Sequence, residues 1–128
     1  MASELRVNTL KDASGNNSVA TSVVFNGSAK AWVNFNGTGT PAISDSTNVS
    51  SITDTATGQQ TFGFSNAMGN VNYAPTACCT AGVYGASNIG SSGIGSEPTS
   101  KTTSQIRMHI GEGYDPADAT TIIHGDLA

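Results

Sequence analysis

Two histidines and a group of acids near the C-terminus are the residues whose types and spacing suit metal chemistry. His109 and His124 flank an acidic turn that runs from Glu112 to Asp118. Zinc accepts imidazole and carboxylate ligands, so a metal site is one interpretation. In the other, both histidines lie at the surface or at the rim of the core, because strand alternation places His109 on the same face as Arg107. We favour the second interpretation and expect no metal.

The sequence lacks the short motifs of common catalytic sites. It contains no Gly-x-Ser-x-Gly elbow, Cys-x-x-Cys pair, phosphate-binding loop or dinucleotide-binding motif. Ser91 and Ser92 have no assignable base, and neither a lysine nor a helix follows directly to complete a phosphate cradle. We therefore predict that the protein is not an enzyme and has no catalytic residue and no cofactor.

Cys78 and Cys79 are the only cysteines, and they are adjacent. On a strand their side chains point to opposite faces. A disulfide between them would need a strained local geometry. We expect two free thiols, which are typical of a reducing compartment.

A strand expected over residues 30–39 carries the only tryptophan. Alternation places Val33 and Phe35 on an apolar face, and Trp32 with Asn34 on the opposite face. We predict that Trp32, Val33 and Phe35 lie in the core or at a subunit interface. For Trp32 a second interpretation stays open, because an exposed tryptophan beside amides can stack on a sugar.

Composition restricts the class of protein. A chain of 128 residues predicts one domain. Charged residues are 11%, against about 25% in ordinary globular chains, and such a low charge argues against disorder. The net charge of −4 speaks against nucleic-acid binding. No apolar run approaches the roughly 20 residues of a membrane span, and the N-terminus does not resemble a signal peptide, so we expect synthesis in a cytosol and no membrane insertion.

Alternating short segments predict an all-β protein. Residues 1–18 are expected to form an N-terminal arm, and residues 19–128 a β-sandwich domain. Val19–Phe25 is predicted to be a strand that turns at Asn26-Gly27 into the strand of Trp32. A second hairpin is predicted from Asn48–Thr53 and Gln59–Phe64. No helical period of useful length is present.

Further strands are expected within residues 71–80, 106–110 and 120–124, and a long loop over residues 82–104. Loops of this length are often functional. Tyr84, Ile89 and Ile94 are the candidate residues for an exposed binding loop. The total of about seven or eight short strands predicts a single antiparallel β-sandwich.

Several segments resemble one family of phage proteins. They are Leu5–Ser18, Lys30–Thr40, Asn48–Asp54, Phe62–Tyr73 and Ile122–Asp126. Together they are similar to the C-terminal β domain of tail-fibre and virion-appendage proteins of marine tailed phages, cyanophages especially. The segment around Trp32 is the most specific of the five.

The resemblance implies a phage virion structural protein that is assembled in the host cytoplasm. It implies a homotrimer, a small tail fibre or appendage component, that contacts other virion proteins and attaches to a glycan or protein receptor on the host surface. The first alternative is a capsid decoration or cement protein whose N-terminal arm laces into the shell. The second alternative is a stand-alone carbohydrate-binding module.

Overall fold

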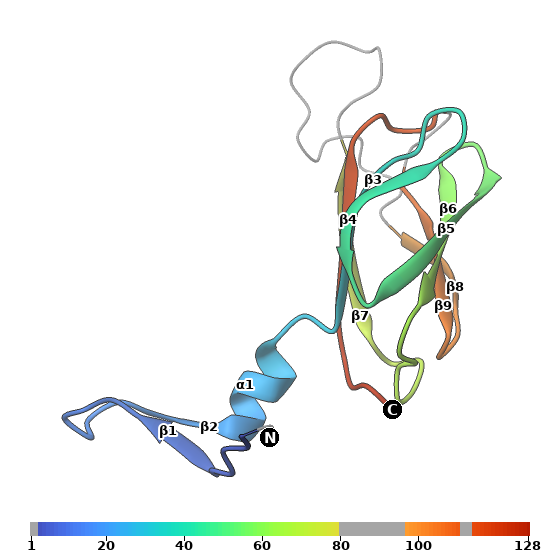
Figure 1. Ribbon diagram of the computed structural model, residues 1–128. Coiled ribbons are helices and arrows are strands. Elements are labelled where there is room, and N and C mark those ends of the chain that lie inside the picture. Colours follow the sequence, from blue (N-terminus) through green and yellow to red (C-terminus); the bar gives the residue numbers. More distant parts are fainter. Residues whose placement is uncertain (1–2, 80–96, 111–113) are drawn as a thin grey trace.

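The computed structural model describes residues 3–79, 97–110 and 114–128 (Figure 1). Its elements are β1 (Thr9–Lys11), β2 (Ser18–Ala20), α1 (Thr21–Gly27), β3 (Ala31–Asn36), β4 (Ala42–Thr47), β5 (Val49–Ala56), β6 (Gln59–Phe64), β7 (Ala74–Cys79), β8 (Glu97–Lys101), β9 (Gln105–His109) and β10 (Ala119–His124). No helix in these ranges has the length and apolar content needed to cross a bilayer.

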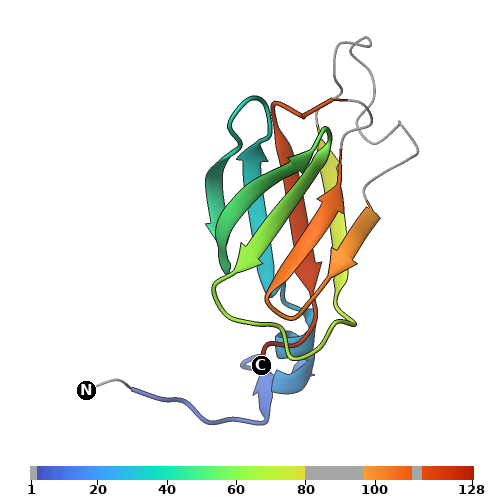
Figure 2. The same ribbon diagram turned by 90° about the vertical axis from the view of Figure 1, so that its right-hand side faces the viewer.

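Two antiparallel sheets of four strands form the body of the molecule. Sheet I has the strand order β4-β3-β10-β7, and sheet II has the order β5-β6-β9-β8. The two sheets face each other, as Figures 1 and 2 show. The predicted all-β antiparallel sandwich is confirmed.

The hairpin predicted around residues 54–58 is also confirmed. β5 pairs with β6 in an antiparallel register that includes Ile52 opposite Phe62. The connecting turn contains Gly58, whose φ of 72° lies in the left-handed region that glycine adopts without a Cβ penalty. The sequence identified this hairpin because turn residues separate two segments of clean alternation.

The core lies between the sheets and follows from alternation along the strands. In β3 every second residue is buried, so Val33 and Phe35 point inward as predicted. Phe35 meets Phe62 of sheet II edge to face, with ring centroids 5.0 Å apart. In the described part of the chain, the core cluster contains the buried side chains of Ala31, Val33, Phe35, Val49, Phe62, Met68, Tyr73, Ile106, Met108, Ile110, Ala119 and Ile123.

The strand predicted for Val19–Phe25 is wrong. The chain instead forms the short β2 and then α1, and Gly27 ends the helix where a hairpin turn was expected. The valines and Phe25 favour a strand only when a neighbouring strand pairs with them, because β-propensity depends strongly on context. No strand of the described chain pairs with residues 21–27, and these residues form a short helix instead.

The loop predicted for residues 82–104 is also wrong at its C-terminal end, where β8 pairs with β9. Pro98 argued against a strand here, because proline has no N–H to donate to the hydrogen bonds between strands. β8 accommodates it as an edge strand, with a register shift between Pro98 and Ser100.

Residues 3–28, called here the projecting segment, lie outside both sheets. β1, β2 and α1 extend beyond one end of the sandwich (Figures 1 and 2). The predicted boundary between residues 18 and 19 falls inside β2, and the sheets begin only at Ala31. The difference arises because residues 19–27 do not join the sandwich as a strand.

Candidate interaction surface

The outer face of sheet I carries a cross-strand apolar pair. Trp32 of β3 lies opposite Ile122 of β10. Thr47 of β4 continues the row on one side, and Thr76 of β7 continues it on the other. Trp32 is partly buried and Ile122 is 40% exposed. Trp32 is therefore not part of the core that contains Val33 and Phe35, and the subunit-interface and sugar-platform interpretations remain for it.

A polar row lies beside this pair. Asp45, Asn34, Thr120 and Cys78 are register neighbours across the four strands. The amide Nδ2 of Asn34 donates to Asp118 Oδ1 at 3.1 Å and to Thr120 Oγ1 at 3.2 Å. Asp45 is the only carboxylate in the four strands of sheet I, which contain no lysine or arginine. The outer face is thus weakly charged, with an apolar centre.

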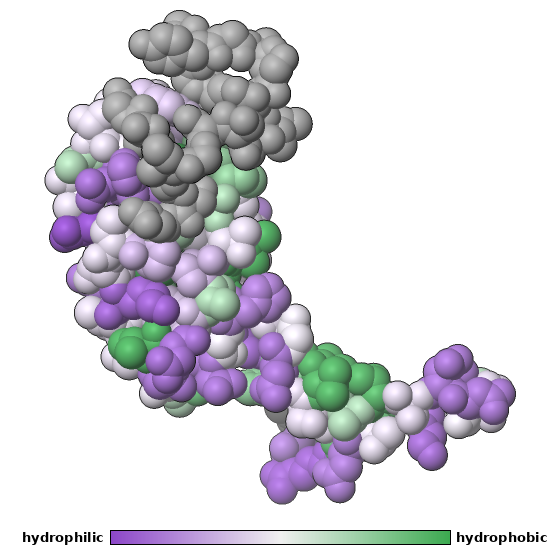
Figure 3. Space-filling view, turned by 180° about the vertical axis from the view of Figure 1, so that it is seen from behind, coloured by the Kyte–Doolittle hydropathy of each residue, from purple (hydrophilic) through white to green (hydrophobic). Residues whose placement is uncertain are grey.

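The projecting segment presents a second apolar surface. Nine large hydrophobic side chains are exposed in the described part of the chain, and six of them belong to this segment: Leu5, Val7, Leu10, Val23, Val24 and Phe25. Helix α1 has no buried residue. In the view from behind, this helix forms a green apolar patch beside the sandwich (Figure 3). Apolar patches of this kind mark interaction sites.

Lys30 connects this helix to the sandwich. The lysine is only 6% exposed, and its backbone N–H donates to Ile123 O at 2.8 Å. Its ammonium group donates to the Phe25 carbonyl and to Ser28 Oγ, and it lies 3.7 Å from the centroid of the Phe25 ring. A cation at the C-terminal end of a helix satisfies free carbonyls and the helix dipole, and it is also attracted to an aromatic face. Lys30 thereby fixes the last turn of α1 at the start of β3.

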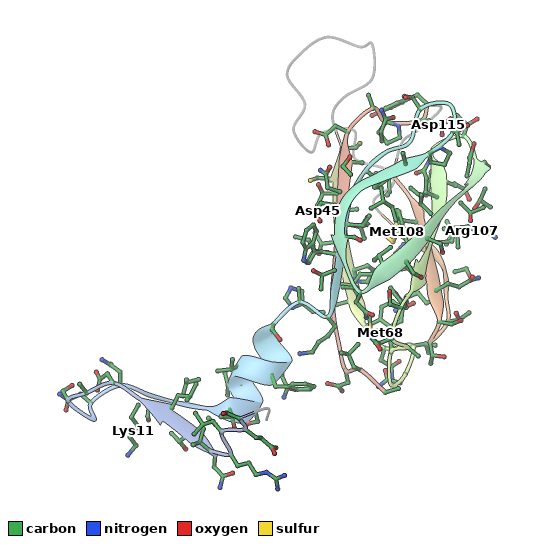
Figure 4. The ribbon with its side chains drawn as sticks, viewed as in Figure 1. Lys11, Asp45, Met68, Arg107, Met108 and Asp115 are labelled. Carbon is green, nitrogen blue, oxygen red and sulfur yellow. The ribbon has the colours of Figure 1, made fainter. Side chains whose placement is uncertain are left out.

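The residues considered for metal chemistry do not come together. His109 lies on β9 of sheet II and His124 on β10 of sheet I. Asp115 accepts hydrogen bonds from Gly58 N at 2.7 Å and from Gln60 Nε2 at 3.3 Å, which gives it a role in closing the β5–β6 hairpin (Figure 4). Glu112 lies outside the described residues. Within the ranges the structure describes, no group of three or more metal-ligating side chains is present.

The two cysteines are free, as predicted. Cys78 is exposed on the outer face of sheet I, and Cys79 points to the inner side, where it is partly buried. The Cys79 thiol lies 3.2 Å from Ile110 O and 3.5 Å from the Tyr114 hydroxyl. The predicted binding-loop residues Tyr84, Ile89 and Ile94 lie outside the described residues.

Sequence reasoning missed Ile122, Lys30 and the apolar helix. Adjacent isoleucines at 122 and 123 carried a signal, because neighbouring residues on a strand point to opposite faces and one of them must face outward. Lys30 carried a weaker signal as an isolated cation in an apolar segment. No local sequence pattern predicted that Val23 and Val24 would be exposed.

Among the described residues, Tyr73 is the titratable residue that burial affects most clearly. Burial raises the pKa of its phenol to about 12 from the usual 10.0. The single hydroxyl proton is shared between Thr102 O at 2.9 Å and Gln105 O at 3.2 Å, which joins the β6–β7 connection to the β8–β9 turn. The fold thus holds this phenol in its neutral form.

We expect the fold to lose stability as the pH rises between about 10 and about 12. In this window the unfolded chain releases the Tyr73 proton while the folded chain keeps it, so ionisation favours unfolding. Urea unfolding at a series of pH values checks this loss. Tyr73→Phe removes the phenol, and its stability should change less over the same window. An equal loss in both proteins would contradict the assignment.

No protein-family model, curated protein or solved structure matches this chain. The fold and the surfaces define its class as an antiparallel β-sandwich with an apolar projecting segment.

Proposed function

We propose that this chain is a structural protein of a phage virion, a small homotrimeric component of a tail fibre or appendage that contributes to host-surface attachment. The main observation in support is the projecting segment, which exposes six large hydrophobic side chains and whose helix α1 has no buried residue. A surface of this kind suits a chain that is packed into an assembly. The sequence resemblance to phage tail-fibre domains supplies the kind of assembly.

The projecting segment also favours a second candidate, a capsid decoration or cement protein. In that role the exposed side chains of β1 and α1 would insert between shell subunits, and the sandwich would face the solvent. Both candidates use the chain as a non-enzymatic building block. They differ in where the protein is found on the particle.

Immunolabelling of intact virions with an antibody against the sandwich separates the two candidates. The proposal expects label at the tail or its appendages, whereas a decoration protein gives label over the capsid. Light scattering of the purified protein should give the mass of a trimer. A monomer that binds neither virions nor host cells would contradict both candidates.

Trp32→Ala is expected to weaken the trimer while the sandwich stays folded. The side chain is only partly buried, so its loss should cost less than the about 3–5 kcal/mol of a fully buried aromatic residue. Light scattering and thermal melting check the two effects separately, with Trp32→Phe as the conservative control. A variant that remains trimeric contradicts the interface role. If glycans also quench the tryptophan fluorescence of the parent, the carbohydrate-platform interpretation is favoured instead.

A further inference from the structure

Two uncovered surfaces of the same chain have matching character. One is the apolar helix α1 of the projecting segment, and the other is the Trp32–Ile122 pair on the outer face of sheet I. Figures 1 and 2 place α1 beyond the end of sheet I and not over this face. Helix α1 therefore does not cover the outer face of sheet I of its own chain.

The projecting segment is too small to be stable by itself. β1 and β2 have three residues each and pair with each other as an antiparallel two-stranded sheet, and α1 has seven residues. Isolated helices shorter than about 12 residues are marginal in water, and so are isolated two-stranded hairpins. The anchor at Lys30 fixes only the end of α1. The rest of the segment needs an external surface to pack against.

The strands beside the two apolar surfaces also carry residues of opposite charge. Lys11 is the only charged residue in β1, β2 and α1, and Asp45 is the only acidic residue in the strands of sheet I. Neither residue belongs to an ion pair in the described part of the chain. In Figure 4, Lys11 and Asp45 lie far apart on the projecting segment and on β4. Lys11 and Asp45 have opposite charges, so the two side chains can form an ion pair between copies.

We propose that the projecting segment of one copy packs on the outer face of sheet I of the next copy. Helix α1 covers Trp32 and Ile122, and Lys11 approaches Asp45. This contact is heterologous, and a heterologous contact forms a closed ring when its rotation permits. The inference rests on the proposed homotrimer and names the interface that would hold it. A second copy is the favoured occupant because each chain carries both complementary surfaces.

Mutation of each surface tests the contact. The double variant Val23→Asp/Val24→Asp and the single variant Ile122→Asp each bury a charge in the interface and should weaken assembly by about tenfold or more. Sedimentation over a range of concentrations measures this change, and circular dichroism checks that the sandwich is folded. Val71→Asp is the matched control, because Val71 is 45% exposed and lies outside both surfaces. It should assemble like the parent.

Charge reversal tests the register. Lys11→Glu and Asp45→Lys should each weaken assembly by about two- to fivefold, as expected for an exposed ion pair. The double variant that carries both changes should recover the parent affinity. Single variants that assemble like the parent, or a double variant without recovery, would overturn the pairing of these residues.

Cross-linking provides a direct test of the contact between chains. Cys78 lies on the outer face of sheet I, two residues along β7 from the neighbour of Ile122. A chain with Val23→Cys, Cys78→Ser and Cys79→Ser is mixed with a Cys79→Ser chain and treated with a short bismaleimide. The expected product is a covalent pair that contains one chain of each kind. As a control, a chain with Val71→Cys, Cys78→Ser and Cys79→Ser is mixed with the same Cys79→Ser chain and treated in the same way. This mixture should give no such pair.

The outcomes separate this inference from the proposed function. A trimeric parent whose Val23→Asp/Val24→Asp variant is also trimeric, with no cross-linked pair, overturns the inference and leaves the homotrimer intact. A monomeric parent at all concentrations overturns both. Selective dissociation together with the mixed covalent pair supports the interface.

Discussion

Replacement of Phe35 by alanine is expected to lower the free energy of unfolding by about 3–5 kcal/mol. Phe35 is fully buried on β3, and its ring packs edge to face against Phe62 on β6. The pair joins sheet I to sheet II, so truncation removes apolar burial and an aromatic contact and leaves a cavity between the layers. Urea unfolding with a single transition measures the loss.

Phe35→Leu should lose less stability than Phe35→Ala, because more of the volume is retained. Val71→Ala should change the stability by no more than about 0.5 kcal/mol, since this valine is 45% exposed. A Phe35→Ala protein that is as stable as Val71→Ala would contradict the assignment of Phe35 to the core.

Gly125→Ala is expected to destabilise the protein by about 1–3 kcal/mol through overpacking. A Cβ atom at Gly125 would lie 2.6 Å from Tyr73 Cβ and 3.2 Å from Tyr73 Cα. Tyr73 cannot move away easily, because its hydroxyl proton is held between Thr102 O and Gln105 O and its ring packs edge to face against Phe64. The chain after β10 must therefore shift.

The matched control is Gly27→Ala, because nothing lies within 4 Å of the Cβ that this change adds. Its stability against urea should equal or slightly exceed that of the parent, because alanine favours a helix more than glycine does. Equal stability of Gly125→Ala and Gly27→Ala would show that the close approach of Gly125 to Tyr73 is not required by the fold.

Where sequence-based prediction succeeded, the signal was local. Alternation in β3 assigned Val33 and Phe35 to the core, and adjacency assigned Cys78 and Cys79 to opposite faces. The β5–β6 hairpin followed from a turn between two alternating segments. Each prediction needed only the period of a strand and the conformational preference of a few turn residues.

The wrong predictions concern segments whose structure depends on whether a strand from elsewhere in the chain pairs with them. Val19–Phe25 has strand-like composition, but no strand pairs with residues 21–27 in the described chain, and the segment forms a helix. Residues 97–101 have loop-like composition with a proline, but β9 offers them an edge and they form β8. In both cases the availability of a hydrogen-bonding neighbour outweighed local propensity.

The sequence by itself determined the all-β class, the inward-facing side chains and the free thiols, because strand periodicity is a property of a few consecutive residues. Only the tertiary structure decided which side chains meet on the outer face of sheet I. Trp32 and Ile122 become neighbours through the pairing of β3 with β10. The projecting segment likewise depends on Lys30, whose ammonium holds the end of α1. The pairing of β3 with β10 joins strands from separate parts of the chain, and local sequence patterns do not specify which strands pair.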